Sequence, residues 1–304
     1  MEEMEFKLLI NGQSLDIYQI NPSYDPKGIV VIVHGMAEHK ERYANMMHAL
    51  ADDGWISLIY DQRGHGRSVK RFEDLGYMDD HHAQKLVQDL AEIVAYAKEQ
   101  APNKPVVLFG HSMGTLVARL YLKKYDDTID RLVLSGAVAA NPLALMGSLL
   151  ASLLEKIYGS RHRSALIQKM ALGAYDSKCP GHGKNHWLSV NAENVEAYNK
   201  EPLDGFTFTL NGFLNLFWMI QHTYDRKGWQ VHNPDLKIYF LAGEEDPVIG
   251  SIKKWQKAQK ALCQRGYRFV SGKLYPHMRH EIFQEKEAQK VIEDLLTFIN
   301  DQNE

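Results

Sequence analysis

The stretch of sequence that decides the fold is Val106-Val107-Leu108-Phe109-Gly110-His111-Ser112-Met113-Gly114, followed by Thr115-Leu116-Val117-Ala118-Arg119-Leu120-Tyr121. An apolar run with the composition of a buried strand meets Gly-His-Ser-Met-Gly and continues directly as a helical pattern. This is the strand, sharp turn and helix of the nucleophile elbow G-x-S-x-G. Ser112 would stand at the tip of the turn, where the flanking glycines leave the room that so tight a turn needs.

The alternation of strands and helices around this stretch predicts a mostly parallel sheet. Apolar β-branched runs are expected to form strands buried on both faces, and Asn11-Gly12 marks a hairpin turn. Helices between the strands indicate βαβ units, in which loops at the carboxyl ends of the strands carry the active site. We expect strands within 5–20 and at 28–33, 55–60, 106–109, 131–136, 237–242 and 267–274, and helices at 42–52, 82–98, 251–264 and 281–300.

The alternation stops near Ala137, and residues 138–225 carry helical patterns with no strand between them. We therefore expect an α/β core formed by residues 1–137 and 226–304. Residues 138–225 would be a helical cap inserted after the sixth strand.

Two helices of the expected cap are strongly apolar, one after Asn141-Pro142 and one near 211–221. Their apolar residues have two interpretations, namely packing of the cap on the core or lining of a pocket for an acyl chain. The sequence also leaves open whether the first helix packs inward or meets a membrane surface as an amphipathic helix. Its apolar stripe consists of Leu143, Met146, Leu149, Leu150, Leu153, Leu154 and Ile157.

Three residues follow one another in the order that a serine nucleophile requires in this fold. A serine hydroxyl needs a neutral imidazole to take its proton and a carboxylate to orient that imidazole. After a G-x-S-x-G elbow, the acid comes next in the chain and the histidine last. The chain supplies Ser112, Asp246 and His280, the last two in loops that follow expected strands.

Some neighbouring residues compete for these roles. Glu244 and Glu245 lie in the loop of Asp246, and His277 lies in the loop of His280. A zinc site is only weakly indicated by the spacing of Cys179, His182 and His186, because no fourth ligand is evident.

An oxyanion needs two backbone N–H donors. Met113 begins the helix after Ser112, where the positive end of the helix dipole favours negative charge. The second donor is expected in the loop after the first long strand, where His34-Gly35-Met36 stands, and the N–H of Met36 is the candidate.

The composition is that of an ordinary globular protein, with 304 residues of which 45% are hydrophobic and 24% charged. A net charge of −3 gives no basic field of the kind that binds nucleic acid. The two cysteines form no redox or disulfide pattern and the start of the chain lacks a signal peptide, which favours a cytoplasmic location. The uncharged run 132–154 is interrupted by Asn141-Pro142, so we do not expect a transmembrane helix.

Several motifs together resemble the bacterial lysophospholipase and monoacylglycerol lipase-like branch of the α/β-hydrolases, also labelled serine aminopeptidase S33-like. The resemblance extends into the cap through Trp187-Leu188-Ser189 and 205–209. The motifs of the core are His34-Gly35-Met36-Ala37-Glu38-His39 with Arg42-Tyr43, Asp61-Gln62-Arg63-Gly64-His65-Gly66, Gly110-His111-Ser112-Met113-Gly114, Gly243-Glu244-Glu245-Asp246-Pro247 and His280-Glu281-Ile282-Phe283.

The resemblance implies an α/β-hydrolase fold and assigns the same five residues to catalysis. Ser112, Asp246 and His280 would form the triad, and Met36 and Met113 would bind the oxyanion. No metal or organic cofactor is implied. Departures from the family pattern occur at Thr115, His277, Asn191 and Glu201, outside the triad.

The sequence thus predicts a serine carboxylic ester hydrolase that acts on monoacyl lipids, such as monoacylglycerols or lysophospholipids, through an acyl-enzyme intermediate. Its expected partner is a small-molecule acyl ester or monoacyl lipid substrate. Two alternatives stay open, a small-substrate peptidase or amidase of the S33-like type and a non-catalytic ligand-binding homologue. We expect no nucleic-acid partner. Transient contact of the cap with a membrane surface, the headgroup, the acyl-chain length and the oligomeric state are left open.

Overall fold

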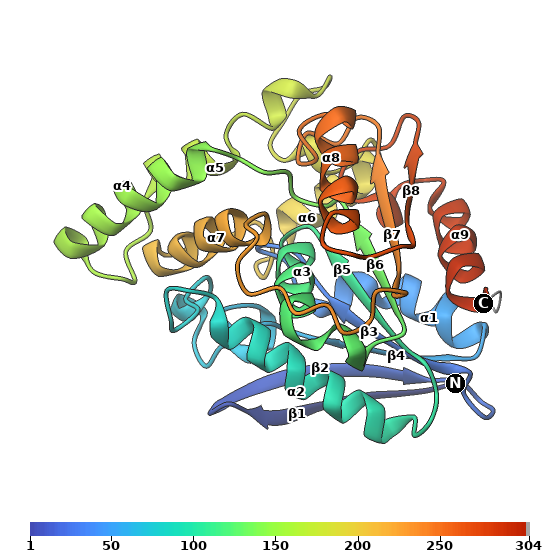
Figure 1. The fold of residues 1–304 in the computed structure, drawn as a ribbon. Helices are drawn as coiled ribbons and strands as arrows, with labels where there is room; N and C mark the ends of the chain where they lie inside the picture. Colours follow the sequence, from blue (N-terminus) through green and yellow to red (C-terminus); the bar gives the residue numbers. More distant parts are fainter. Residues whose placement is uncertain (302–304) are drawn as a thin grey trace.

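The computed structural model describes residues 1–301 and is built around one eight-stranded sheet in the order β1-β2-β4-β3-β5-β6-β7-β8 (Figure 1). Strand β2 pairs antiparallel with β1 and β4, and all other neighbours are parallel. The predicted mostly parallel sheet is therefore confirmed. The strands are β1 (Glu2–Ile10), β2 (Gln13–Asn21), β3 (Gly28–Val33), β4 (Trp55–Tyr60), β5 (Val106–His111), β6 (Arg131–Ser135), β7 (Lys237–Gly243) and β8 (Val270–Tyr275).

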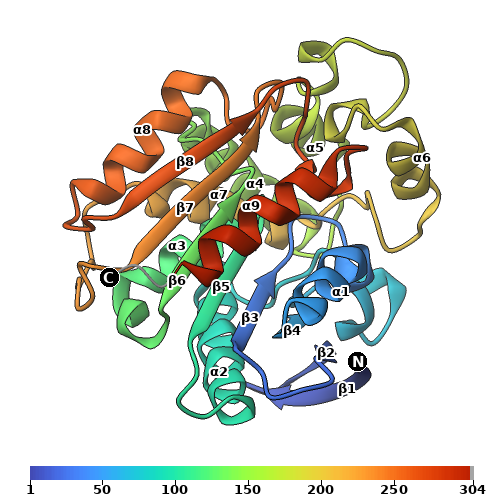
Figure 2. The same ribbon diagram turned by 90° about the vertical axis from the view of Figure 1, so that its right-hand side faces the viewer.

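Helices cover both faces of the sheet (Figure 2). Helices α1 and α9 pack on one face, and α2, α3 and α8 pack on the other. Every residue of β3, β4 and β5 is buried, which explains why these strands are continuous apolar runs. The helices are α1 (Ala44–Asp52), α2 (Gln84–Gln100), α3 (Met113–Tyr125), α4 (Leu143–Tyr158), α5 (Ala165–Leu172), α6 (Ala192–Lys200), α7 (Leu210–Thr223), α8 (Ile252–Cys263) and α9 (Ala288–Asn300).

Helices α4 to α7 lie between β6 and β7 in the chain, as the sequence predicted for the cap. Figure 1 shows α4 projecting from the body, with α7 between it and the core. The division of the chain at 138 and 225 stays a prediction. Within residues 1–301, no helix combines the length and apolar content needed to cross a membrane.

Helix α4 turns its small residues inward and its large apolar residues outward. Ala144, Gly147 and Ala151 are buried, and a Cβ on Gly147 would lie 2.7 Å from the ring of Phe217 in α7. Of the stripe that the sequence left open, Leu150 and Leu154 are half-buried against the core, and the other members face outward. Its exposed residues are Leu143, Met146, Leu149, Leu153 and Ile157.

The end of the chain differs from the expected helix at 281–300. Only a short 3-10 turn, Ile282–Gln284, precedes α9, which begins at Ala288. The side chains explain the interruption, because Glu285 accepts hydrogen bonds from the backbone N–H groups of Val190 and Arg279, both at 3.0 Å.

Candidate active site

Ser112 occupies a strained turn between β5 and α3. Its φ of 51° and ψ of −117° are unusual for a residue with a side chain. Both flanking positions require glycine because other backbone atoms lie too close for a side chain. A Cβ on Gly110 would lie 2.8 Å from the carbonyl oxygen of Gly114. A Cβ on Gly114 would collide with the carbonyl oxygen of Val33. The predicted strand, sharp turn and helix are present.

Asp246 and His280 lie side by side at the carboxyl edge of the sheet. The Nδ1 atom of His280 is 2.9 Å from Oδ2 of Asp246, and both side chains are buried. The other carboxylate oxygen accepts the N–H of Val248 at 2.8 Å, which fixes the orientation of the acid. Burial opposes a charge on His280, but the Asp246 carboxylate outweighs burial and raises the pKa of His280 above its ordinary value.

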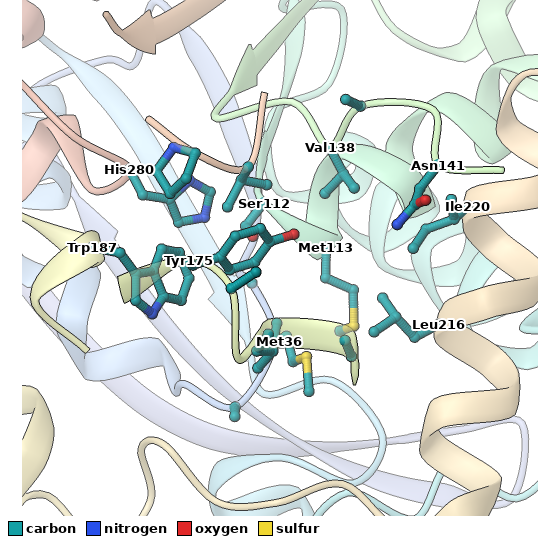
Figure 3. Close-up of a pocket in the computed structure, with 18 of the residues that line it drawn as sticks. Met36, Ser112, Met113, Val138, Asn141, Tyr175, Trp187, Leu216, Ile220 and His280 are labelled. Carbon is teal, nitrogen blue, oxygen red and sulfur yellow. The ribbon is translucent and has the colours of Figure 1, made fainter. Parts of the chain in front are cut away.

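Ser112 and His280 line the same cavity, which has a volume of about 530 Å³ (Figure 3). The Nε2 atom of His280 is buried and makes no hydrogen bond within residues 1–301. Figure 3 shows His280 and Trp187 on one side of Ser112 and Leu216 and Ile220 on the opposite side, with the Tyr175 ring overlapping Ser112 in this view. The serine therefore lies between an aromatic end and an aliphatic end of one cavity.

The competing residues lie outside this cavity. His277 is 92% exposed, and its Nδ1 atom is 3.6 Å from Oε1 of Glu245. Glu244 is also exposed. The structure brings Asp246 and His280 together and leaves these alternatives at the surface.

The two expected oxyanion donors also line the cavity. Met113 is the first residue of α3, and the first N–H groups of a helix have no partner within it. The residue after Met36, Ala37, has a φ of 53°, and its N–H donates to Nε2 of His65 at 3.2 Å. Burial lowers the pKa of His65 to about 4, so the imidazole stays neutral and can accept this bond. The assignment of both donors stays a prediction.

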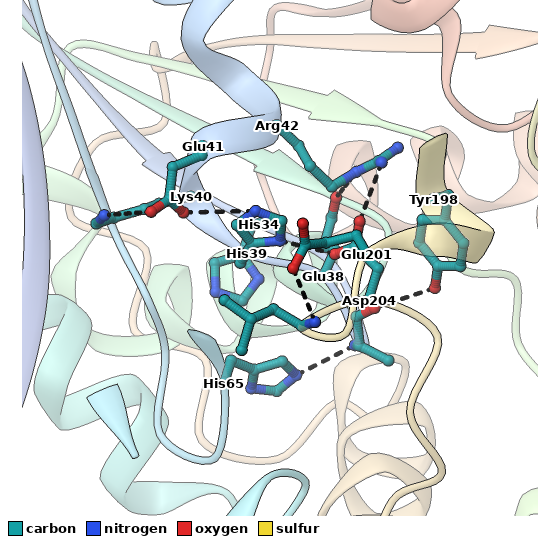
Figure 4. A network of polar contacts seen from close by, with 12 residues as sticks. His34, Glu38, His39, Lys40, Glu41, Arg42, His65, Tyr198, Glu201 and Asp204 are labelled. Carbon is teal, nitrogen blue, oxygen red and sulfur yellow. Dashed lines mark hydrogen bonds and ion pairs between the residues drawn. The ribbon is translucent and has the colours of Figure 1, made fainter. Parts of the chain in front are cut away.

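A buried ionic network holds the loop that contains Met36 (Figure 4). Glu38 accepts the N–H of Gly35 and lies 3.4 Å from Nε of Arg42. The same guanidinium lies 3.2 Å from Asp204 of the cap region and 2.7 Å from Glu281, the neighbour of His280. One arginine thus connects three segments that are distant in the sequence.

Three carboxylates around one guanidinium leave an excess of negative charge. Burial raises the pKa of Glu38 to about 7; Arg42 opposes this rise, and Glu281 and Asp204 add to it. His39 compensates in part, because its Nδ1 lies 2.8 Å from Asp204. Burial opposes the charge on His39, but the hydrogen bond with Asp204 raises its pKa.

Comparison with known proteins identifies the family. Residues 24–287 match the model of the serine aminopeptidase, S33 family. The chain belongs to this family. Its fold is that of the α/β-hydrolases, as the sequence predicted.

Relatives of this S33 hydrolase include lipases of monoacyl glycerides. The monoacylglycerol lipase of Mycolicibacterium smegmatis is 26% identical over 288 residues, which cover 93% of this chain and 92% of that protein. The monoglyceride lipase of Mus musculus is 30% identical over 193 residues, which cover 64% of this chain and 57% of that protein.

Solved structures agree with this relationship. A highly thermostable carboxyl esterase from Bacillus coagulans in complex with glycerol has a TM-score of 0.90 and 25% identity, covering 99% of this chain and 98% of that one. A soluble variant of the Saccharomyces cerevisiae monoglyceride lipase has a TM-score of 0.75 at 17% identity, covering 99% of this chain and 96% of that one. The second likeness concerns the fold alone.

Sequence reasoning on this S33 hydrolase missed the aromatic wall beside His280. The Trp187 ring lies 5.2 Å from the His280 ring and 5.0 Å from the Tyr175 ring, measured between centroids. Trp187 stood in a motif shared with the family, but nothing in the spacing of the sequence indicated which residue it would contact. No motif or spacing in the sequence indicated that Tyr175 would belong to the site.

The spacing that suggested zinc forms a different set of contacts. The ring nitrogens of His186 lie 2.9 Å from the carbonyl oxygen of Gly183 and 3.1 Å from that of Cys179. Among residues 1–301, no group of three or more histidine, cysteine or acidic side chains is arranged to hold a metal ion. The sulfur of Cys179 lies 3.7 Å from the carbonyl oxygen of Glu245.

Proposed function

We propose that this S33 hydrolase cleaves carboxylic esters of monoacyl lipids through an acyl-enzyme intermediate on Ser112. The observation that carries the proposal is the single cavity, which joins Ser112 and His280 to an apolar section under the cap. The names of the relatives support ester cleavage. The apolar section supports an acyl chain as the part of the substrate that it holds.

The proposed reaction begins with attack of Ser112 Oγ on the ester carbonyl carbon. Nε2 of His280 takes the hydroxyl proton, and Asp246 stabilises the imidazolium through Nδ1. The N–H groups of Met36 and Met113 donate to the tetrahedral oxyanion. His280 then gives its proton to the leaving alcohol, and the acyl group remains on Ser112.

Deacylation repeats these steps with water in place of the serine. His280 takes a proton from the water molecule, whose oxygen attacks the acyl carbon. Collapse of the second tetrahedral intermediate breaks the bond to Ser112 and returns the proton to its hydroxyl. The products are a free fatty acid and the alcohol released in the first half of the reaction.

The acyl section of the cavity lies between α4 and α7. Leu216, Phe217 and Ile220 contribute from α7, and Ala144 and Gly147 contribute from α4. These side chains are apolar, so burying an acyl chain against them is favourable by about 0.8 kcal/mol for each methylene. A small peptide substrate would gain little from this section.

Labelling with a fluorophosphonate tests the nucleophile. We expect one covalent adduct, mapped by peptide mass spectrometry to Ser112, and loss of both labelling and esterase activity in Ser112→Ala. An adduct on another residue, or full activity of Ser112→Ala, contradicts the proposal. Ser148→Ala, at a half-buried position of α4 outside the cavity lining, is the matched control.

The amidase alternative is tested by comparing substrates. We expect turnover of long-chain monoacyl esters to exceed turnover of proline and alanine arylamides by a large factor. The opposite ranking favours the peptidase alternative. Binding of the esters without any turnover favours the non-catalytic alternative.

We also propose that the exposed face of α4 contacts a lipid surface. Leu149 is 65% exposed and Ile157 is 63% exposed, and Leu143 and Met146 on the same helix line the cavity. For a helix with this composition, burying the apolar side in the interface of a bilayer is favourable in free energy. A double substitution, Leu149→Glu with Leu153→Glu, is expected to abolish sedimentation with lipid vesicles while activity on a dissolved short-chain ester is kept. Unchanged sedimentation contradicts the contact.

The cytoplasmic location remains a prediction from the sequence.

A further inference from the structure

The imidazole of His280 is held by a single side-chain hydrogen bond. Its Nδ1 atom lies 2.9 Å from Asp246, and within residues 1–301 its Nε2 atom has no hydrogen-bond partner. A bond at one nitrogen fixes that atom but lets the ring tilt about it. Two other rings lie next to the imidazole, His111 of β5 with its centroid at 4.7 Å and Trp187 of the cap region at 5.2 Å (Figure 3). The plane of the base therefore depends on side chains outside the triad.

A short 3-10 turn of the cap region carries the indole, and this turn is hydrogen-bonded to both neighbours of the base. The backbone N–H of Glu281 donates to the carbonyl oxygen of Leu188 at 2.8 Å. The guanidinium of Arg279 donates to the carbonyl oxygen of His186 at 2.6 Å. Trp187 thus lies between two residues whose carbonyl groups are bonded to the residues before and after the base.

Further buried bonds fix the turn in this position. Asp176 accepts the backbone N–H of Trp187 at 3.2 Å. Glu285 accepts the hydroxyl of Ser189 at 2.7 Å and the backbone N–H of Arg279 at 3.0 Å, so one carboxylate joins the two segments. The indole is 9% exposed, which leaves it little room to move away from the imidazole.

We propose that Trp187 is a positioning residue, which holds the His280 imidazole in the plane from which Nε2 reaches Ser112. The inference rests on the proposed ester hydrolysis at Ser112 and adds a side chain of the cap region to those that govern its chemical step. Displacing a catalytic group by about 1 Å can cost about a hundredfold in rate. The contact between indole and imidazole should therefore affect kcat and not only the binding of substrate.

Replacement of the indole tests this role. In Trp187→Leu we expect kcat on a dissolved short-chain ester to fall by about tenfold or more, with KM little changed. Trp187→Phe keeps a ring beside the imidazole and should retain most of the activity. The matched control is Trp218→Leu, because Trp218 lies outside the cavity lining. An unchanged kcat in Trp187→Leu overturns the proposal. So does a rise in KM alone, because the indole would then only bind substrate.

Indole fluorescence reports the contact in the unaltered site. A charged imidazolium quenches an indole that it touches, and a neutral imidazole does so far less. We therefore expect the emission of Trp187 to fall as the pH is lowered through the pKa of His280. The step should be absent in His280→Gln and in Trp187→Phe. All proteins in this comparison carry Trp218→Phe, because the Trp218 ring stacks on His222 with centroids 4.1 Å apart. Absence of the step overturns the proposal.

Other titrating groups near the two rings need controls. Burial and the charge of His280 lower the pKa of His111, which stays neutral through the step. Burial opposes a charge on His186, but hydrogen bonds to backbone carbonyl groups raise its pKa. The pKa of Glu38 is raised by burial to about 7. The step should persist in His186→Gln and in Glu38→Gln, and its loss in either variant overturns the assignment to His280. The remaining ionisable side chains around the rings, unaltered in all these variants, are Asp246, Glu281, Asp176, Arg279 and Tyr175.

The two kinds of measurement separate this inference from the proposed function. Hydrolysis that is lost in Ser112→Ala but unaltered in Trp187→Leu overturns the inference and leaves ester hydrolysis standing. A fluorescence step without hydrolysis of any ester contradicts the proposed function and supports the placement of the indole on the imidazole. Circular dichroism verifies that Trp187→Leu is folded. Where it is not, the kcat of Trp187→Phe and the fluorescence step decide.

Discussion

At the scale of single residues, the imidazole of His280 sets the pH at which the proposed reaction operates. The base must be neutral to accept the serine proton. Because Asp246 raises the pKa of His280, the neutral form is reached at a higher pH than for an ordinary histidine. We expect activity to increase as the pH rises through this raised pKa.

Replacement of the carboxylate tests this relation. In Asp246→Asn, the acidic limb of the kcat profile should move to lower pH, because the group that favours the imidazolium is gone. The maximal kcat should fall by about a thousandfold or more, since the imidazole loses its orientation. Rates measured from acidic to alkaline pH on a soluble ester check both effects. An acidic limb that stays in place contradicts the pairing. Asp235→Asn, at an exposed ion pair with Arg268, is the control.

The raised pKa of Glu38 predicts how the free energy of unfolding depends on pH. Its pKa in the folded protein, about 7, lies above its ordinary value of 4.5. Its contribution to folding is therefore complete below the ordinary pKa and is lost as the pH rises through the folded pKa. Glu38→Gln does not titrate, so its free energy of unfolding should rise relative to that of the unchanged protein between about pH 5 and about pH 8.

Glu41 provides the control for this measurement. Burial opposes its charge, but the hydrogen bond and charge of Lys40, a backbone hydrogen bond and the charge of His39 together lower the pKa of Glu41. Its titration thus lies below the same pH window, and Glu41→Gln should show a constant difference across it. Urea unfolding at several pH values measures both variants. A flat difference for Glu38→Gln would mean that Glu38 is ionised throughout.

At the scale of secondary-structure elements, the contact between α4 and α7 sets the space for the acyl chain. Gly147 and Phe217 both line the cavity and touch where the helices meet. In Gly147→Val, the added side chain should push the helices apart or fill the acyl section. We expect kcat/KM for long acyl chains to fall at least tenfold, with short-chain esters little affected.

The outer side of the same helix supplies the comparison. Leu149→Val changes an exposed residue of α4, and it should leave the dependence on chain length unaltered. A series of monoacyl esters of increasing length measures both variants. If Gly147→Val keeps the original preference, the acyl chain does not lie between these helices.

The sequence predicted the elbow and the sheet because their signals are local. Gly110, Ser112 and Gly114 stand within one turn, and each buried strand is a short apolar run of its own. The direction of α4 was not predictable, because a stripe of large apolar residues specifies one side of a helix but not what that side faces. The decisive residues were the small ones, Ala144 and Gly147, which allow α7 to approach.

At the scale of the whole molecule, Arg42 connects the loop of Met36, the region of Asp204 and the residue after His280. Arg42→Met would leave buried carboxylates without a partner, and breaking such a pair typically costs about 3–5 kcal/mol. We expect a loss of this size in the free energy of unfolding measured in urea, with a smaller loss for Arg42→Lys. Arg71→Met, at an exposed pair with Asp74, should change stability little. A loss of less than about 1 kcal/mol in Arg42→Met contradicts a structural role for the network.

The contacts of this network were not predictable from the sequence. Arg42, Asp204 and Glu281 are far apart in the chain, and no periodicity or spacing relates such residues. The sequence proposes Ser112, Asp246 and His280 as a triad although they are equally dispersed, because the order of nucleophile, acid and base is fixed by the fold.

Gly136, the residue after β6, has a consequence for protein engineering. Its φ is +58°, and a Cβ there would lie 2.8 Å from Nδ1 of His280 and 3.4 Å from Oδ2 of Asp246. Gly136, which precedes the helices of the cap region in the chain, thus lies directly against the imidazole. A chimaera that takes its cap from another hydrolase should therefore be joined after this glycine, so that the donor supplies substrate preference while the recipient keeps this support for the base.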